Sequence, residues 1–148
     1  MSESSNEATV HRVVDAFNRK HLDEVLAEFT PAAALREPFI EEPIAGMDAL
    51  RDFHAGLFES FPDEILTIVQ LISAGDWVVA RTTASGTHTG DFLGMRPTGR
   101  PFSVPECLVY QFDADGRIAN QWTYVDSGSI AKQFGYTFAP ASDDAVPS

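Results

Sequence analysis

The sequence has little cysteine and little positive charge, and both shortages exclude classes of protein. Cys107 is the one cysteine among 148 residues, so neither a disulfide within the chain nor a cluster of thiolate metal ligands can form. Ten lysines and arginines stand against 22 aspartates and glutamates, which gives a formal net charge of −12. Because nucleic acids and anionic membranes are bound through clustered basic residues, we expect neither as a partner.

Targeting and cofactor motifs are missing as well. The first residues, MSESSNEATVHRVV, lack the basic and apolar regions of a signal peptide. No apolar run approaches the roughly 20 residues that a membrane span needs. The four histidines show no HxH or HExxH spacing, and no glycine-rich nucleotide loop occurs. We therefore expect a cytoplasmic protein with no metal and no cofactor.

The composition is that of a globular protein, with 44% hydrophobic and 22% charged residues. The length fits one domain and leaves no room for two. We assign residues 1–8 to a disordered N-terminus, residues 9–136 to a single domain and residues 137–148 to a flexible tail.

The first half of the chain has the periodicity of helices. Valines at 10, 13 and 14 and a phenylalanine at 17 form one apolar stripe, and residues 22–29 repeat the pattern until Thr30-Pro31, which we expect to end that helix. Prolines in residues 31–45 favour a loop with a short strand at 33–37. A third helix is predicted after Gly46, and Phe61-Pro62 ends it.

The second half is rich in β-branched and aromatic residues. Four segments, 65–72, 77–88, 102–112 and 117–126, are separated by turn signals such as Asp115-Gly116. A short helical turn is expected at 129–134. Helices followed by four consecutive strands predict an α+β fold, in which a curved antiparallel sheet forms a cone around the N-terminal helices. A cavity in the mouth of the cone would be the binding site.

Several motifs of the second half resemble one known family. Gly75-Asp76-Trp77 begins a strand, GTHTGDFLG follows at 86–94, and PTGR forms a turn at 97–100. The chain closes with Trp122, Asp126 and the tripeptide Gln133-Phe134-Gly135. Together these stretches resemble the SnoaL-like polyketide cyclase, or ester cyclase, family of the nuclear transport factor two-like superfamily, from about Val10 to Gly135.

The resemblance implies a cone-shaped sheet closed by three helices, often in a dimer or larger assembly. It also implies acid/base catalysis of an intramolecular aldol ring closure, without metal or cofactor, by the aspartate that matches Asp126. We therefore expect a hydrophobic small-molecule substrate and a homodimer or homotetramer.

Asp126 and His88 are the predicted catalytic residues. Asp126 ends an apolar strand, where burial would raise the pKa of its carboxyl toward that of a general base. As an alternative, Asp126 caps the helical turn that follows it. His88 would hydrogen-bond Asp126 or a substrate oxygen, or it would only fix the turn between Gly86 and Gly90.

Six further residues are predicted to bind substrate. His54 lies on the apolar stripe of the third helix, where a histidine either orients a ligand or belongs to the core. Glu106 and Tyr110 share one strand face, and if that face is interior Glu106 is a buried carboxylate. The aromatic side chains of Trp122, Phe17 and Phe92 would form flat walls against the substrate, or plain core.

Two other functions use the same pocket. An epoxide hydrolase or epoxide-opening cyclase would use Asp126, Arg81 and Glu106 around a water molecule. A non-catalytic module would only bind a small ligand or dimerise. That reading predicts a filled cone, with Asp126 bonded only to the backbone that follows it.

Overall fold

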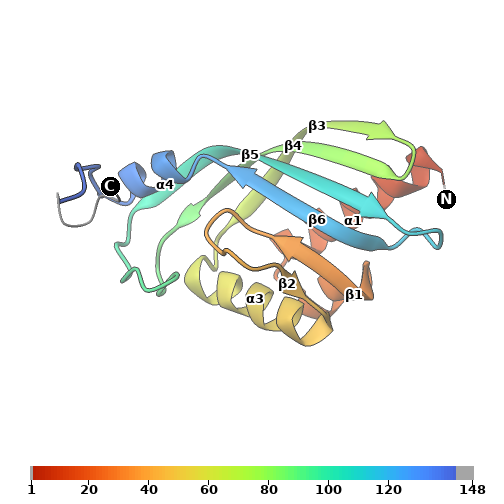
Figure 1. Ribbon diagram of the computed structural model, residues 1–148, viewed down its shortest axis with the longest axis horizontal. Coiled ribbons are helices and arrows are strands. Elements are labelled where there is room, and N and C mark those ends of the chain that lie inside the picture. The colour runs from red at the N-terminus through yellow and green to blue at the C-terminus, as the bar shows by residue number, and fades with distance from the viewer. Residues whose placement is uncertain (1, 143–148) are drawn as a thin grey trace.

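One six-stranded sheet curves around the helices of this chain (Figure 1). The computed structural model describes residues 2–142. The helices are α1 (Glu3–Asn18), α2 (Leu22–Ala27), α3 (Met47–Ser60) and α4 (Ser127–Gln133). The strands are β1 (Phe29–Arg36), β2 (Ile44–Ala45), β3 (Ile65–Ala74), β4 (Trp77–Thr87), β5 (Pro101–Phe112) and β6 (Ile118–Val125). The predicted α+β class is confirmed.

The strands are ordered β2-β1-β6-β5-β4-β3 across the sheet. The four long strands of the second half pair antiparallel with their neighbours, as predicted, but β1 pairs parallel to β6, with Leu35 opposite Gln121. The expectation of a wholly antiparallel sheet is therefore wrong. Parallel pairing is possible here because α3 and four strands separate β1 from β6 in the chain, so no tight hairpin fixes their relative direction.

The first helix begins earlier than the apolar stripe predicted. Ser2 caps α1 in a reciprocal arrangement in which its hydroxyl accepts from the Ser5 backbone N–H at 3.1 Å, while the Ser5 side chain accepts from the Ser2 N–H. Residues 3–8 are thus helical rather than disordered, and Asn6 is buried. In the predicted tail, residues 137–142 form no helix or strand, and residues 143–148 lie outside the described residues.

The second helix is shorter than predicted, because the chain has already entered β1 at Phe29. Pro31 therefore lies inside a strand and does not end a helix. Its position is tolerated because the pairing of β1 with β6 shifts between Phe29 and Ala34, where a proline interrupts no regular ladder of hydrogen bonds.

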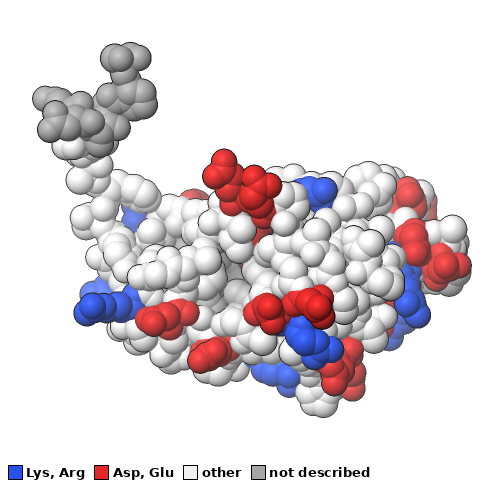
Figure 2. All heavy atoms as spheres, turned by 60° about the horizontal axis from the view of Figure 1, so that its bottom comes forward, with Lys and Arg blue, Asp and Glu red and all other residues white. Residues whose placement is uncertain are grey.

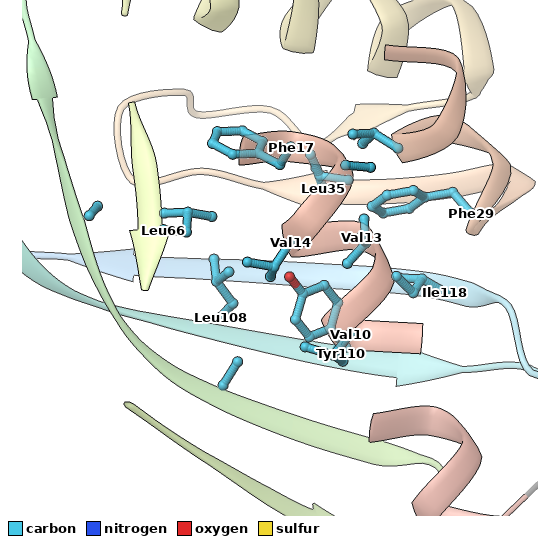
Figure 3. Packing of buried hydrophobic residues seen from close by; sticks show 14 of the residues in the cluster. Val10, Val13, Val14, Phe17, Phe29, Leu35, Leu66, Leu108, Tyr110 and Ile118 are labelled. Atoms are coloured by element: carbon cyan, nitrogen blue, oxygen red, sulfur yellow. The ribbon is translucent and has the colours of Figure 1, made fainter. Parts of the chain in front are cut away.

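The core lies between α1 and the concave face of the sheet (Figure 3). Val10, Val13 and Val14 of α1 point toward the sheet and are at most 5% exposed. Leu108 and Tyr110 of β5 meet them from below. Side chains alternate between the two faces of a strand, so every second residue of β5 from Phe102 onward faces the core. In the described part of the chain, no helix is long and apolar enough to cross a membrane.

Candidate active site

A cavity remains between the concave face of the sheet, α1 and α3, so the cone is not filled. Its walls also include the segment 37–40 that follows β1, residues 92–93 and α4. Nine aromatic side chains line it: Phe17, Phe29, Phe39, Phe53, Phe61, Phe92, Phe102, Tyr110 and Phe134. An apolar cavity with a few polar groups is the usual form of a small-molecule site.

Three carboxyl groups open into this apolar space, and Glu106 is the one that the sequence predicted. Glu106 lies on the concave face of β5 and lines the cavity. Burial raises its pKa to about 7, because the charged form loses its hydration there. At neutral pH the side chain is therefore present in both the protonated and the ionised form.

Glu37 is the second carboxyl group and is held by a short chain of hydrogen bonds. The Thr123 hydroxyl donates to Glu37 Oε1 at 2.9 Å, and Gln121 Nε2 donates to the Thr123 hydroxyl at 3.3 Å. Burial raises the pKa of Glu37 to about 8, against the opposing effect of the Thr123 bond, and the charge of Glu106 raises it further. Glu37 is therefore mainly protonated at neutral pH.

Glu64 is the third carboxyl group, just beyond the end of α3. It is 9% exposed, and burial followed by the charge of Glu106 raises its pKa to about 8. Lys20 lies near it, but the ammonium group donates to the backbone carbonyls of Phe17 and Glu64. The Lys20 side chain makes no ion pair in the described part of the chain.

His54 also lines the cavity, as a neutral imidazole. Its Nδ1 donates to the Leu50 carbonyl at 2.8 Å, one turn earlier in α3. Burial lowers its pKa, and the ring packs among Phe29, Phe53 and Phe58. A neutral imidazole that donates through Nδ1 keeps Nε2 as a hydrogen-bond acceptor.

The structure thus brings together most of the side chains that were predicted to bind substrate. Phe17, His54, Phe92, Glu106 and Tyr110 all line the cavity. They come from α1, α3, β5 and the segment after β4, and strand parity alone could not decide which face of β5 was interior.

Trp122 lies on the other face of the sheet, so its predicted place in the pocket is wrong. Thr123 and Gln121 of β6 face the cavity, and Trp122 between them faces outward. Its ring stacks on Trp77 with centroids 5.4 Å apart, and the Arg36 guanidinium lies 4.8 Å from its ring.

Asp126 lies outside the cavity, and its position corresponds to the alternative prediction of a helix cap. Its Oδ1 accepts from the Ser129 backbone N–H at 3.0 Å, at the start of α4. The side chain is exposed and borders an open hollow on the convex face together with Arg81 and Tyr124. Successive side chains of a strand point to opposite faces of the sheet. Because Val125 faces the cavity, the adjacent Asp126 faces outward.

His88 is fully buried but does not line the cavity. Its ring stacks on Phe134 with centroids 4.4 Å apart and packs against Phe61, and both phenylalanines are cavity walls. Its Nδ1 lies 3.2 Å from the Thr98 hydroxyl, and its backbone pairs with Gly99 and Arg100. In this structure His88 anchors the loop between β4 and β5, and no hydrogen bond joins it to Asp126 among residues 2–142.

Gly90 of the GTHTGDFLG motif positions the same loop. A Cβ atom there would lie 2.8 Å from the Glu59 carbonyl oxygen, so only glycine allows this approach to the end of α3. The motif therefore acts on the site by packing, since it holds the loop that carries Phe92 against α3.

The three residues of the epoxide-opening alternative, Asp126, Arg81 and Glu106, border one open hollow on the convex face and not the apolar cavity as a group. Arg81 is exposed there and donates to Gln70 Oε1 at 2.8 Å, and Glu106 lines the apolar cavity as well as this hollow. Among the described residues, no three histidine, cysteine, aspartate or glutamate side chains are arranged to hold a metal ion.

Sequence reasoning missed Glu37 and Glu64, although strand parity could have found both. Ala33 and Leu35 are buried on β1, and Glu37 continues their alternation past the end of the strand. Glu64 precedes the buried Leu66 of β3 by two residues in the same way. The signal was weak because Glu37 precedes Pro38, and Glu64 follows Pro62 by two residues, so both stand at the ends of segments that are typical of loops.

The comparisons with known proteins agree with this fold and confirm the resemblance. The model of the SnoaL-like polyketide cyclase family matches residues 7–134. An aklanonic acid methyl ester cyclase of Streptomyces galilaeus is 30% identical over 130 residues, which cover 86% of this chain and 89% of the relative. The nogalonic acid methyl ester cyclase of Streptomyces nogalater is 29% identical over 125 residues, with 83% and 92% covered.

Solved structures of the same family superpose on most of the chain. A protein of Jannaschia sp. CCS1 that is assigned to the SnoaL-like polyketide cyclases has a TM-score of 0.83 at 25% identity, with 91% of this chain and 94% of that chain covered. The match of the family model over nearly the whole domain and the identity to curated cyclases lead to one conclusion. This chain belongs to the SnoaL-like polyketide cyclase family.

Proposed function

We propose that this enzyme closes a ring in a polyketide ester by an intramolecular aldol reaction, with Glu106 as the general base. The Streptomyces relatives are named as cyclases of aklanonic and nogalonic acid methyl esters, which suggests a substrate of this kind. One observation carries the choice of base: the carboxyl of Glu106 opens into the apolar cavity, whereas that of Asp126 caps α4 on the convex face.

The reaction needs one group that takes a proton and gives it back. The Glu106 carboxylate removes a proton from a carbon next to a carbonyl, and the resulting enolate carbon attacks a second carbonyl of the same molecule. The new alkoxide then takes the proton from the Glu106 carboxyl group. The product is an isomer of the substrate, and the base is regenerated without an external reductant or oxidant.

The environment of Glu106 suits both steps. A pKa of about 7 places its proton affinity close to the working pH, where general bases are most effective. The aromatic walls hold the two reacting carbonyls close together and keep water away from the enolate. Phe17 of α1 and Phe92 of the loop that follows β4 both belong to these walls.

A pair of matched carboxyl variants tests the proposal. Glu106→Gln keeps the shape of the side chain and removes its basicity, so kcat for cyclisation of aklanonic acid methyl ester should fall about 100-fold or more. Asp126→Asn keeps an oxygen that can cap α4 and should change kcat less than threefold. Turnover is measured by chromatography of a product with unchanged mass.

The reverse result would exclude Glu106. If Asp126→Asn abolished turnover while Glu106→Gln retained it, the aspartate would be the base, as the family resemblance implies. Binding of the substrate to both variants, measured by fluorescence quenching, shows that the cavity is still formed.

A further inference from the structure

We propose that the Tyr110 hydroxyl and the Glu37 carboxyl group form an oxyanion site, which binds the enolate oxygen of the reacting molecule. The inference rests on the proposed ring closure for its role in turnover. Its structural basis is separate, because it concerns two groups that the base does not need.

Tyr110 presents a hydroxyl without a partner. The residue is 2% exposed, and its hydroxyl makes no hydrogen bond to any other described residue. Figure 3 shows this oxygen pointing away from β5 toward α1, beside Val14. This oxygen is not among the fully buried atoms that lack a partner, so it is accessible from the cavity, where an acceptor can satisfy its O–H group. Because Tyr110 lines the cavity, a bound ligand can supply that acceptor.

Glu37 presents a second donor. Its Oε1 accepts from Thr123, and Thr123 is itself held by Gln121, so the orientation of the carboxyl group is fixed. When the group is protonated, the proton resides on the remaining oxygen, Oε2, which has no hydrogen-bond partner among residues 2–142. A pKa of about 8 keeps that proton in place at neutral pH.

Strand register places the two donors on the concave face, on either side of β6. Tyr110 pairs with Gln121 across β5 and β6, and Arg36 pairs with Trp122 across β1 and β6, so Glu37 follows beside Thr123. Glu106 stands on the same face of β5, beyond Leu108, opposite Val125. The base and the two donors therefore surround one part of the cavity.

The protonation states of the groups around the cavity suit them to donate hydrogen bonds to an enolate oxygen. Burial, followed by the charges of Glu106 and Glu37, raises the pKa of Tyr110 far above its ordinary value, so the phenol stays protonated. The other titratable groups that line the cavity are His54, which is neutral, and Glu64. Fixed donors in a space that excludes water stabilise developing negative charge more strongly than water does.

Binding of 2-naphthol at neutral pH, where Glu37 keeps its proton, tests the site apart from turnover, because an oxyanion site favours the ionised oxygen, which resembles an enolate on an aromatic frame. Naphtholate and naphthol are distinguished by their fluorescence, and naphthalene serves as the probe without oxygen. Tyr110→Phe should weaken naphtholate binding about tenfold or more and change naphthalene binding less than twofold. The matched control is Tyr124→Phe, which removes an exposed hydroxyl on the convex face and should change neither.

Two Glu37 variants test whether this side chain donates a hydrogen bond to the ligand or only fills space. Glu37→Gln keeps an N–H donor and should retain most of the naphtholate affinity, whereas Glu37→Leu should lose about tenfold. In turnover, Tyr110→Phe should lower kcat about 100-fold with KM within threefold, because the interaction strengthens as the enolate forms.

Equal naphtholate affinity in the wild type, Tyr110→Phe and Glu37→Leu would overturn the oxyanion site. Retained naphthalene binding shows that each variant is folded, so a loss of naphtholate alone is specific. If naphtholate binds as expected but Glu106→Gln still turns over substrate, the oxyanion site stands and the proposed base fails.

Discussion

The two faces of the sheet carry polar and aromatic residues in similar variety, but only the concave face isolates them from water. On β5 and β6, Glu106 and Thr123 face the cavity, and their neighbours Cys107 and Tyr124 face the convex side. Carboxyl groups on the concave face have raised pKa values near 7 and 8. Chemical reactivity here therefore depends on the direction of a side chain more than on its type.

The convex face shows what the same residue types do in contact with solvent. Trp77 and Trp122 stack there, Arg81 bonds to Gln70, and Asp126 caps a helix. Figure 2 shows small, separate groups of acidic side chains on the face that it presents, with basic ones scattered among them. Most of the net charge of −12 thus resides in hydrated groups, and the chemistry depends on the few carboxyls that are not hydrated.

The largest expected effect comes from placing a charge on each face of β5 in turn. Val104 is 1% exposed on the concave side, so Val104→Asp should lower the free energy of unfolding by about 4 kcal/mol or more and prevent folding in a marginal background. Ser103→Asp, one residue away on the exposed side, should change it by about 0.5 kcal/mol or less. Urea denaturation measures both, and equal losses would show that the faces are not distinct.

The next effect is a dependence of stability on pH that originates on the concave face. The pKa of Glu106 is raised from 4.5 to about 7, so folding binds its proton, and stability is complete below pH 4.5 and is lost as the pH rises through 7. The loss for this group amounts to about 3 kcal/mol at full ionisation. Glu37 and Glu64 contribute in the same direction at slightly higher pH.

Urea unfolding at pH 5 and at pH 8.5 measures this dependence. The wild type should be less stable at pH 8.5, and Glu106→Gln should reduce the difference, whereas Asp126→Asn should leave it unchanged. If the wild type and Glu106→Gln lost the same free energy of unfolding between pH 5 and pH 8.5, Glu106 would be hydrated in the folded protein.

The smallest effect concerns the cap on the convex side. Asp126→Ala removes the acceptor for the Ser129 N–H and should cost about 1 kcal/mol, while Asp126→Ser should restore most of it. The loss should be confined to α4 and visible as faster amide exchange at Ser129. Loss of substrate affinity in Asp126→Ala with unchanged exchange would place Asp126 in the site instead.

Much of the fold could be predicted from the sequence, because periodicity and turns are local properties. Apolar spacing located α3 and the four long strands, and Asp115-Gly116 marked the last hairpin. The helical start at Glu3 was missed because its first turns are polar and a cap, rather than an apolar stripe, begins them. The parallel pairing of β1 with β6 joins segments far apart in sequence, and no local pattern encodes it.

The candidate site was predictable only in part, for a related reason. Alternation on β5 grouped Glu106 with Tyr110, and helical spacing put Phe17 and His54 on apolar stripes, and all four line the cavity. The family resemblance predicted roles for Asp126 and Trp122, whose motif marks the end of β6. Both side chains point outward. Glu37 is the last residue of the strand predicted at 33–37 and precedes Pro38, so its alternation with Leu35 rests on one residue at the edge of a loop.

The sequence by itself determined the acidic character of the chain, the α+β class, most of its helices and strands, and the family to which it belongs. Those properties follow from composition, from periods of 3.6 and 2, and from motifs that are read one segment at a time. The tertiary structure decided which face of each strand became the inside of the cone. Burial depends on what packs above a strand, and that choice left Asp126 in water as a cap and put Glu37, Glu64 and Glu106 in a cavity where their proton affinity rises.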